Sequence, residues 1–120
     1  MSTADASPRR GEVWLVELDP TCGAEMQKTR PAVVISSDCI GRLPLRVVVP
    51  VTEWKEEFRN YQWMVRIEPS TGNGLGKVSA VDALQIRSLD LQRFVKPKGH
   101  VPASLIDEIT AAVSTIIEHQ

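Results

Sequence analysis

Two apolar runs near the start of the chain enclose one long polar loop, and this arrangement constrains the fold more than any other feature. Residues 13–18 and 32–37 are rich in valine and other apolar residues, which predicts two strands. Pro20 and Gly23 interrupt regular structure between them. The connection is too long for a tight hairpin, and loops of this length usually carry function or mobility. We therefore expect two β-strands joined by a functional loop.

The loop ends in Arg30-Pro31, where the second apolar run begins. A proline fixes its own φ angle and biases the preceding residue to an extended conformation. We therefore expect the Arg30 guanidinium to leave the loop at a defined angle, as a planar fork of donors that suits a phosphate. Glu25, in the same loop, could orient Arg30 or accept a proton. A structural ion pair of Arg30 with Glu25 or Asp19 is the alternative.

The middle of the chain predicts further short strands. They are expected at residues 46–49, 61–67, 77–86 and 94–96. Pro50 should shorten the first of these or place it at a sheet edge. The charged residues 53–60 predict a loop, residues 69–74 a turn, and residues 88–92 a turn or a single helical turn.

The end of the chain changes from strand to helix periodicity. One helical face carries Leu105, Ile106, Ile109, Val113, Ile116 and Ile117. Pro102 suits a first helical turn, and Ser104 with Asp107 resembles a capping box. Five to seven short strands followed by one amphipathic helix predict a mainly β protein, with a small, strongly bent sheet or barrel and the helix packed on it.

The length of 120 residues predicts a single domain, at residues 9–120, after a small polar tail at residues 1–8 that we expect to be disordered. The tail lacks the apolar segment of a secretory signal, and no run is long enough to span a membrane, so a cytoplasmic location is expected. Cys22 and Cys39 lack zinc-site spacing and should be reduced thiols. His100 and His119 are isolated, so neither a metal nor another cofactor is expected.

The charge distribution is more informative than the net charge of −1. Residues 77–98 carry five basic residues against Asp82 and Asp90, whereas residues 101–120 carry three acidic residues and no lysine or arginine. Such segregation allows a local positive groove on a near-neutral protein, as nucleic-acid binding requires. Ordinary solvated faces are the alternative.

Four segments of the chain resemble the MazF/PemK family of toxin endoribonucleases. The first covers residues 10–20, Gly23, Glu25 and residues 29–36; the others cover residues 47–52, 85–90 and 93–94 before the final helix. The resemblance extends over about residues 9–118. It implies an SH3-like barrel that forms a homodimer, which is consistent with the predicted strands and helix.

The resemblance also implies an activity, sequence-specific and metal-independent cleavage of single-stranded RNA. In this chemistry the ribose 2′-hydroxyl attacks the adjacent phosphate, which leaves a 2′,3′-cyclic phosphate and a 5′-hydroxyl end. The expected partners are a cognate antitoxin that covers the RNA groove of the dimer, and DNA bound together with that antitoxin. A catalytically inactive SH3-like module that binds RNA or protein is the alternative.

Three residues match catalytic positions of the family. Arg30 matches the catalytic arginine, Thr52 the catalytic threonine, and Glu25 a glutamate implicated in substrate binding or proton transfer. A free guanidinium, with a pKa above about 12, donates protons poorly at neutral pH, so Arg30 is expected to stabilise charge on phosphorus. Otherwise, a threonine at a strand end is usually a turn or capping residue, and Glu25 an exposed loop carboxylate.

Six more residues are expected to contact the RNA: Lys28, Arg46, Trp54, Asp82, Gln85 and Arg87. Trp54, Phe58 and Tyr61 flank the polar loop next to Thr52, where aromatic rings could stack on unpaired bases. A loop anchored by its own aromatic residues is an equal alternative. Simple solvation is the alternative for Lys28 and Arg46.

The sequence departs from the family at two positions. Ala24 stands where some relatives carry a histidine, and Leu84 stands where many carry an acidic residue. On a strand, Asp82 would face the same side as Leu84. Asp82 could therefore replace the missing carboxylate, or it could pair with Lys77 or Arg87.

Overall fold

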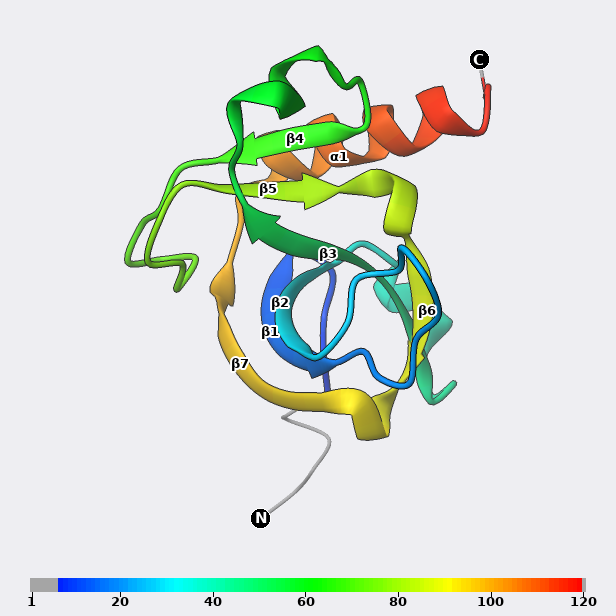
Figure 1. Ribbon diagram of the computed structural model, residues 1–120. Helices are drawn as coiled ribbons and strands as arrows, with labels where there is room; N and C mark the ends of the chain where they lie inside the picture. Colours follow the sequence, from blue (N-terminus) through cyan, green and yellow to red (C-terminus); the bar gives the residue numbers. More distant parts are fainter. Residues whose placement is uncertain (1–6, 120) are drawn as a thin grey trace.

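The computed structural model describes residues 7–119 (Figure 1), so most of the expected disordered tail, residues 1–6, lies outside the described residues. Pro8 is buried, and its carbonyl accepts a hydrogen bond from Nε of Arg46 at 3.0 Å. Pro8 is therefore part of the folded domain and not of a tail. The elements follow in this order: β1 Glu12–Glu17, β2 Thr29–Val34, η2 Asp38–Ile40, β3 Leu45–Glu53, η3 Glu56–Asn60, β4 Met64–Ile67, β5 Ser79–Asp82, η4 Ala83–Gln85, β6 Arg87–Asp90, η5 Leu91–Arg93, β7 Phe94–His100 and α1 Ala103–Ile116.

The strands form one strongly curled antiparallel sheet, in the order β4-β5-β3-β2-β1-β7, with β6 also paired to β3. In Figure 1, β4 and β5 lie beside α1, while β1, β2 and β7 curve away below them. The prediction of a small, bent, mainly β fold with one C-terminal helix is confirmed.

The nine-residue strand β3 joins the two parts of the sheet. Residues 45–48 pair with β6, residues 48–50 with β2, and residues 51–53 with β5. Pro50 stands where the strand exchanges β2 for β5, a position at which a missing N–H is tolerated. The prediction that Pro50 shortens the strand is therefore wrong, and Thr52 and Glu53 continue β3 beyond it.

Both faces of the sheet are buried, because alternate side chains of the same strands enter two different clusters. On β1, Val13 packs under the helix, whereas Trp14 and Val16 pack on the opposite face. Trp14 also meets Phe94 edge-on, with ring centroids 5.7 Å apart. This two-sided packing fixes the register of β1 and β2, and so fixes the strands on either side of the loop.

Helix α1 covers the first cluster with Ile106, Ile109 and Ala112. Two details of the predicted helix are wrong. Pro102 is the N-cap and no side chain caps the helix, so Ser104 lies inside the first turn and forms no capping box. Ile117 lies just past the helix and is exposed. Within residues 7–119, no helix is both long and apolar enough to cross a membrane.

Several strands begin or end at residues other than those predicted. The strand expected at 77–86 ends at Asp82, whose carboxylate accepts a hydrogen bond from the backbone N–H of Leu84 and starts η4. The segment 88–92, expected as a turn or a single helical turn, is divided between the end of strand β6 and the helical turn η5. The last strand continues to His100, and β4 begins only at Met64.

Candidate functional site

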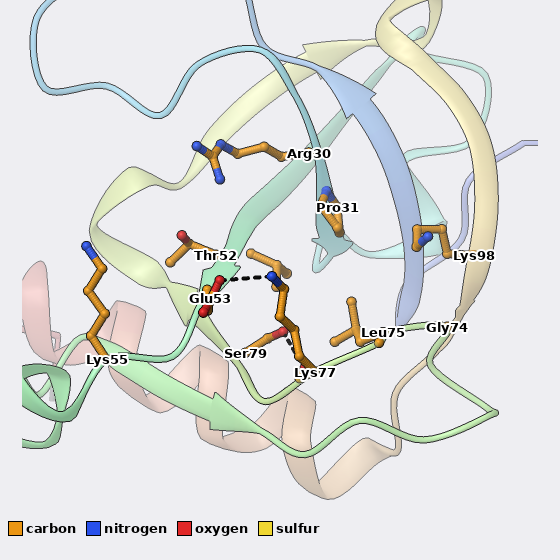
Figure 2. A pocket seen from close by; sticks show the side chains of 12 residues that line it. Arg30, Pro31, Thr52, Glu53, Lys55, Gly74, Leu75, Lys77, Ser79 and Lys98 are labelled. Carbon is orange, nitrogen blue, oxygen red and sulfur yellow. Dashed lines mark hydrogen bonds and ion pairs between the residues drawn. The ribbon is translucent and has the colours of Figure 1, made fainter.

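Arg30 and Thr52 line one open cavity of about 430 Å³ on the surface of the sheet (Figure 2). Of the described residues, four cationic side chains and one carboxylate line it: Arg30, Lys55, Lys77, Lys98 and Glu53. We call it the cationic cavity. Its charge is strongly positive, on a protein whose net charge is −1. A local positive site on a near-neutral chain, as the segregated charges allow, is therefore present.

Arg30 reaches this cavity because it is the second residue of β2, paired with Val16 of β1. Its Nε donates to the carbonyl of Gln27 at 3.0 Å, which fixes the plane of the guanidinium. Among the described residues, neither Glu25 nor Asp19 forms an ion pair with it, and its two Nη atoms have no hydrogen-bond acceptor. The structural ion-pair alternative for Arg30 is therefore wrong, and the Nη donors are available to a ligand.

One wall of the cationic cavity is a tight turn packed on β7. The buried Asn73 closes the turn: its Oδ1 accepts from the N–H groups of Ser70 and Leu75, and its Nδ2 donates to the carbonyl of Glu68. Gly74 has a φ of +70°, and any Cβ there would overlap the carbonyl of Lys98. The turn therefore holds the backbone of Lys98 against the wall and leads directly into Lys77.

The carboxylate of this cavity is held by one of its lysines. Nζ of Lys77 lies 2.9 Å from Oε2 of Glu53, across the end of the β3–β5 pair (Figure 2). Both side chains are largely exposed, 70% for Lys77 and 62% for Glu53. The hydrogen bond and the charge of Lys77 hold the pKa of Glu53 below its ordinary value, so this carboxylate is ionised at neutral pH.

Glu25 lies elsewhere, in a second cavity of about 420 Å³. Its lining joins the loop between β1 and β2 to η4 and the start of β6: Ala24, Glu25, Leu84, Gln85, Ile86 and Arg87. We call it the loop cavity. Oε1 of Glu25 accepts from the backbone N–H of Cys22 at 2.7 Å. The structure thus brings Arg30 together with Thr52, and Glu25 together with Gln85 and Arg87.

Side chains from distant segments fix the loop of this cavity. The Gln85 side-chain amide donates to the carbonyl of Ala24 at 3.2 Å and accepts from the N–H of Met26 at 2.5 Å. Arg87 donates to the carbonyl of Leu18, and Arg93 to that of Asp19. The long loop is therefore hydrogen-bonded to η4, β6 and η5, which holds Glu25 in place.

Arg46, which was predicted to contact RNA, is instead buried in the fold. It is only 8% exposed, and its guanidinium donates to four backbone carbonyls, those of Pro8, Leu43, Leu45 and Gly41. A buried guanidinium satisfied in this way is structural. The sequence could not show this, because the four acceptors are main-chain oxygens.

Asp82 also differs from its prediction. It is 6% exposed and ends β5, whereas Leu84 lies in η4 and is 57% exposed, so the two do not share a strand face. Asp82 forms no ion pair with Lys77 or Arg87 among the described residues. Burial raises the pKa of Asp82, although hydrogen bonds from Leu84 and Gln85 oppose that effect. Asp82 cannot supply a surface carboxylate at position 84.

Trp54 belongs to an aromatic cluster beside the cationic cavity and does not line it. Its ring meets Phe58 edge-on at 5.9 Å, and the guanidinium of Arg66 lies 5.2 Å from its centroid. Tyr61 contacts Phe58 and stacks on Trp63 at 4.9 Å. The loop is thus anchored by its own aromatic residues, and base stacking by Trp54 stays a prediction. Lys28 is exposed and lines neither cavity, so its RNA contact also stays a prediction.

Four residues of the cationic cavity were not predicted from the sequence: Glu53, Lys55, Lys77 and Lys98. The segregated basic charge of residues 77–98 was a signal for two of them, but only the β3–β5 pairing and the turn against β7 bring them to Thr52. In residues 7–119, no group of three or more histidine, cysteine, aspartate or glutamate side chains is arranged to hold a metal. Cys22 and Cys39 are free and exposed.

Comparison with known proteins gives consistent matches over nearly the whole chain. Residues 9–117 match the family model of the PemK-like, MazF-like toxin of type II toxin–antitoxin systems. The endoribonuclease PemK of Escherichia coli is 36% identical over 110 residues, which cover 90% of this chain and 80% of PemK. The endoribonuclease MazF9 of Mycobacterium tuberculosis is 36% identical over 111 residues, which cover 88% of this chain and 92% of MazF9.

The fold also matches solved structures over nearly the whole chain. MazF from Deinococcus radiodurans superposes with a TM-score of 0.77 and 26% identity, covering 92% of this chain and 96% of that one. A MazE-MazF structure from the same organism gives a TM-score of 0.71 and 26% identity, covering 94% of this chain and 97% of the matched chain.

Proposed function

Because the chain belongs to the PemK-like, MazF-like toxin family of type II toxin–antitoxin systems, whose similar relatives are endoribonucleases, we propose that it cleaves single-stranded RNA through the cationic cavity. The observation that carries this proposal is the meeting of Arg30 and Thr52 in a cavity with three further cations. A phosphodiester is the part of RNA that such a site attracts most strongly. The predicted catalytic residues Arg30 and Thr52 and the positive charge of the cavity therefore both favour a phosphate as the ligand.

The two groups have distinct roles at the phosphate. The Nη donors of Arg30 have no acceptor among the described residues and would bind the non-bridging oxygens, where negative charge grows in the transition state. The Thr52 hydroxyl would donate to a phosphate oxygen from the end of β3. The 2′-hydroxyl of the RNA attacks phosphorus and the P–O5′ bond breaks. The leaving 5′-oxygen takes a proton from water, so the products are a 2′,3′-cyclic phosphate and a 5′-hydroxyl end. The nucleophile belongs to the substrate, so no activated water is required.

Glu25 is the proposed proton acceptor, although it lines the loop cavity. The backbone N–H of Cys22 donates to Oε1 of Glu25, and no donor among residues 7–119 bonds to the second oxygen, which can therefore accept a proton. With Glu25 in this position, the RNA strand spans both cavities: its reacting phosphate contacts Arg30 and its neighbouring ribose or base contacts the loop cavity. Gln85 and Arg87 would then contact the same nucleotide.

Two partners follow from the family. A toxin of a type II system has a cognate antitoxin, and a MazE-MazF pair is among the similar structures. We propose that an antitoxin segment with acidic side chains covers the cationic cavity, since carboxylates would pair with the same donors that bind phosphate. We also propose that the chain forms a homodimer whose groove binds the RNA. Mass measurement in solution tests the dimer, and full activity from a demonstrated monomer would refute the groove.

Cleavage of cellular RNA by the purified protein in excess EDTA tests the proposed function. Sequencing the new 5′ ends identifies the motif, and an oligonucleotide with that motif is then prepared with one 2′-deoxy nucleotide immediately 5′ of the cleaved bond. We expect the parent strand to be cut in EDTA and the deoxy strand to bind without being cut. Cleavage of the deoxy strand, or an absolute need for a divalent cation, contradicts the mechanism. No cleavage of any RNA favours the inactive binding module.

A further inference from the structure

The cationic cavity contains more positive charge than one scissile phosphate requires. Arg30 and Thr52 lie on β2 and β3, whereas Lys77 precedes β5 and Lys98 lies on β7. These elements approach the cavity from different sides, as Figure 2 shows. A single phosphodiester carries one negative charge, and neighbouring phosphates of an RNA strand carry one each. The spread of cations therefore fits a run of backbone, with phosphates beyond the one that Arg30 contacts.

One of these lysines already holds an anion. Glu53 pairs with Lys77 at 2.9 Å, and no other carboxylate among residues 7–119 lines the cavity. Both side chains are largely exposed, so water competes with the pair and the ions separate readily. A phosphate oxygen accepts from an ammonium in the same way as a carboxylate oxygen does. The carboxylate of Glu53 is thus chemically equivalent to a ligand that the cavity is suited to bind.

We infer that Lys77 is a second phosphate subsite, for a phosphodiester that flanks the cleaved one, and that Glu53 is an internal substitute which this phosphate displaces. The inference rests on the proposed function, because it assigns a further part of the same RNA path. When the flanking phosphate binds, the ammonium group of Lys77 leaves its ion pair with Glu53 and pairs with the RNA, and no covalent bond changes. Glu53 therefore opposes RNA binding, and its neighbour Thr52 acts on the phosphate that is cleaved.

The position of Lys77 supports this role. It follows the turn that Asn73 closes, and Gly74 of that turn packs on the backbone of Lys98. Ser79 Oγ donates to the carbonyl of Lys77 at 2.9 Å, so the backbone of Lys77 is held on both sides. Only the side chain is free to exchange partners, as a binding subsite requires.

Binding of the uncleavable 2′-deoxy oligonucleotide at several salt concentrations tests the inference. We expect Lys77→Ala to weaken binding and to lower the slope of log Kd against log salt by about 0.7, the value for one phosphate contact to single-stranded nucleic acid. Lys77→Arg should keep the wild-type slope. Glu53→Gln should tighten binding about two- to fivefold, as expected for removal of one exposed competing ion pair.

The matched control is Glu68→Gln. Glu68 is 67% exposed and forms a 2.7 Å ion pair with Arg66, but it does not line the cavity, so affinity should not change. Thermal unfolding of each variant identifies any loss of fold. An unchanged slope for Lys77→Ala overturns the subsite, and Glu53→Gln that binds normally but fails to cleave the parent strand overturns the substitute role and makes Glu53 catalytic. If wild-type protein does not cut the parent RNA, the proposed function itself is wrong.

Discussion

The cationic cavity and the loop cavity are similar in size, but their walls are chemically different. The first is lined by four cations and one carboxylate, and strand ends and a glycine turn build it. The second has an exposed leucine, an alanine and an isoleucine around Glu25, Gln85 and Arg87. A charged wall suits a phosphate of any nucleotide, whereas a mixed apolar and polar wall can distinguish bases. We therefore interpret the pair as a division between backbone binding and nucleotide recognition.

Arg30→Ala tests the cationic cavity most directly, and we expect its effect to be the largest. Loss of a donor to the developing negative charge should lower the cleavage rate by about 10²- to 10³-fold. The side chain has no ion-pair partner among the described residues, so the midpoint of thermal unfolding should stay close to that of the wild type.

Arg9→Ala serves as the control for this variant, because Arg9 is an exposed arginine outside both cavities. The measurement is single-turnover cleavage with saturating protein. Near wild-type cleavage by a folded Arg30→Ala protein would remove the phosphate role, and a variant that unfolds would make Arg30 structural.

Glu25→Gln tests whether the two cavities act on one nucleotide. If Glu25 accepts the proton of the 2′-hydroxyl, the cleavage rate should fall by about 10²-fold while RNA affinity changes little. An unchanged rate with altered bases at the cut site would instead assign Glu25 to recognition, and the division between the cavities would then be complete.

The fold could be predicted further than the site could. The apolar run of β1 and the helical periodicity of α1 are local signals, and they identified these elements correctly. The effects of Pro50 and Asp82 could not be predicted because they depend on tertiary context. Pro50 lies where a strand changes partner, and Asp82 turns the chain by accepting a hydrogen bond from Leu84. The burial of Arg46 could not be predicted for a similar reason, since its carbonyl partners have no signature in the sequence.

Arg30 and Thr52 came from a resemblance that extends over most of the chain, and the structure brings them together. The sequence did not predict that Lys77 and Lys98 belong to the site, because most lysine side chains are simply solvated. Only the contact between Gly74 and the backbone of Lys98, together with strand pairing, determines that they reach the same cavity.

Asp82→Asn has a smaller expected effect, on stability. Burial raises the pKa of Asp82, so the folded protein binds this proton more tightly than the unfolded chain does. Stability from this group is therefore lost as pH rises from the ordinary aspartate pKa through the raised one, and the cost is fully present above the raised pKa. Asparagine keeps an acceptor for the N–H of Leu84 and removes the charge.

We therefore expect the free energy of unfolding of Asp82→Asn at pH 7 to equal that of the wild type or to exceed it by up to about 1 kcal/mol. This difference should disappear on acidification. Urea unfolding at several pH values measures the difference. A constant difference at all pH values would show that the carboxylate of Asp82 is not linked to folding. Cleavage should not change, because Asp82 is buried and lines neither cavity.

Leu84→Asp should have the smallest effect on the fold and the most selective effect on the loop cavity. Leu84 is 57% exposed, so its replacement should alter stability by no more than about 0.5 kcal/mol. The new carboxylate would replace an apolar side chain of the loop cavity, beside Glu25. It should therefore weaken contacts with any base that packs on the leucine and change the preferred motif. The salt dependence of RNA binding should stay within experimental error of the wild type if the phosphates are bound in the cationic cavity. A changed slope with an unchanged motif would place phosphate in the loop cavity and would reverse the roles assigned to the two sites.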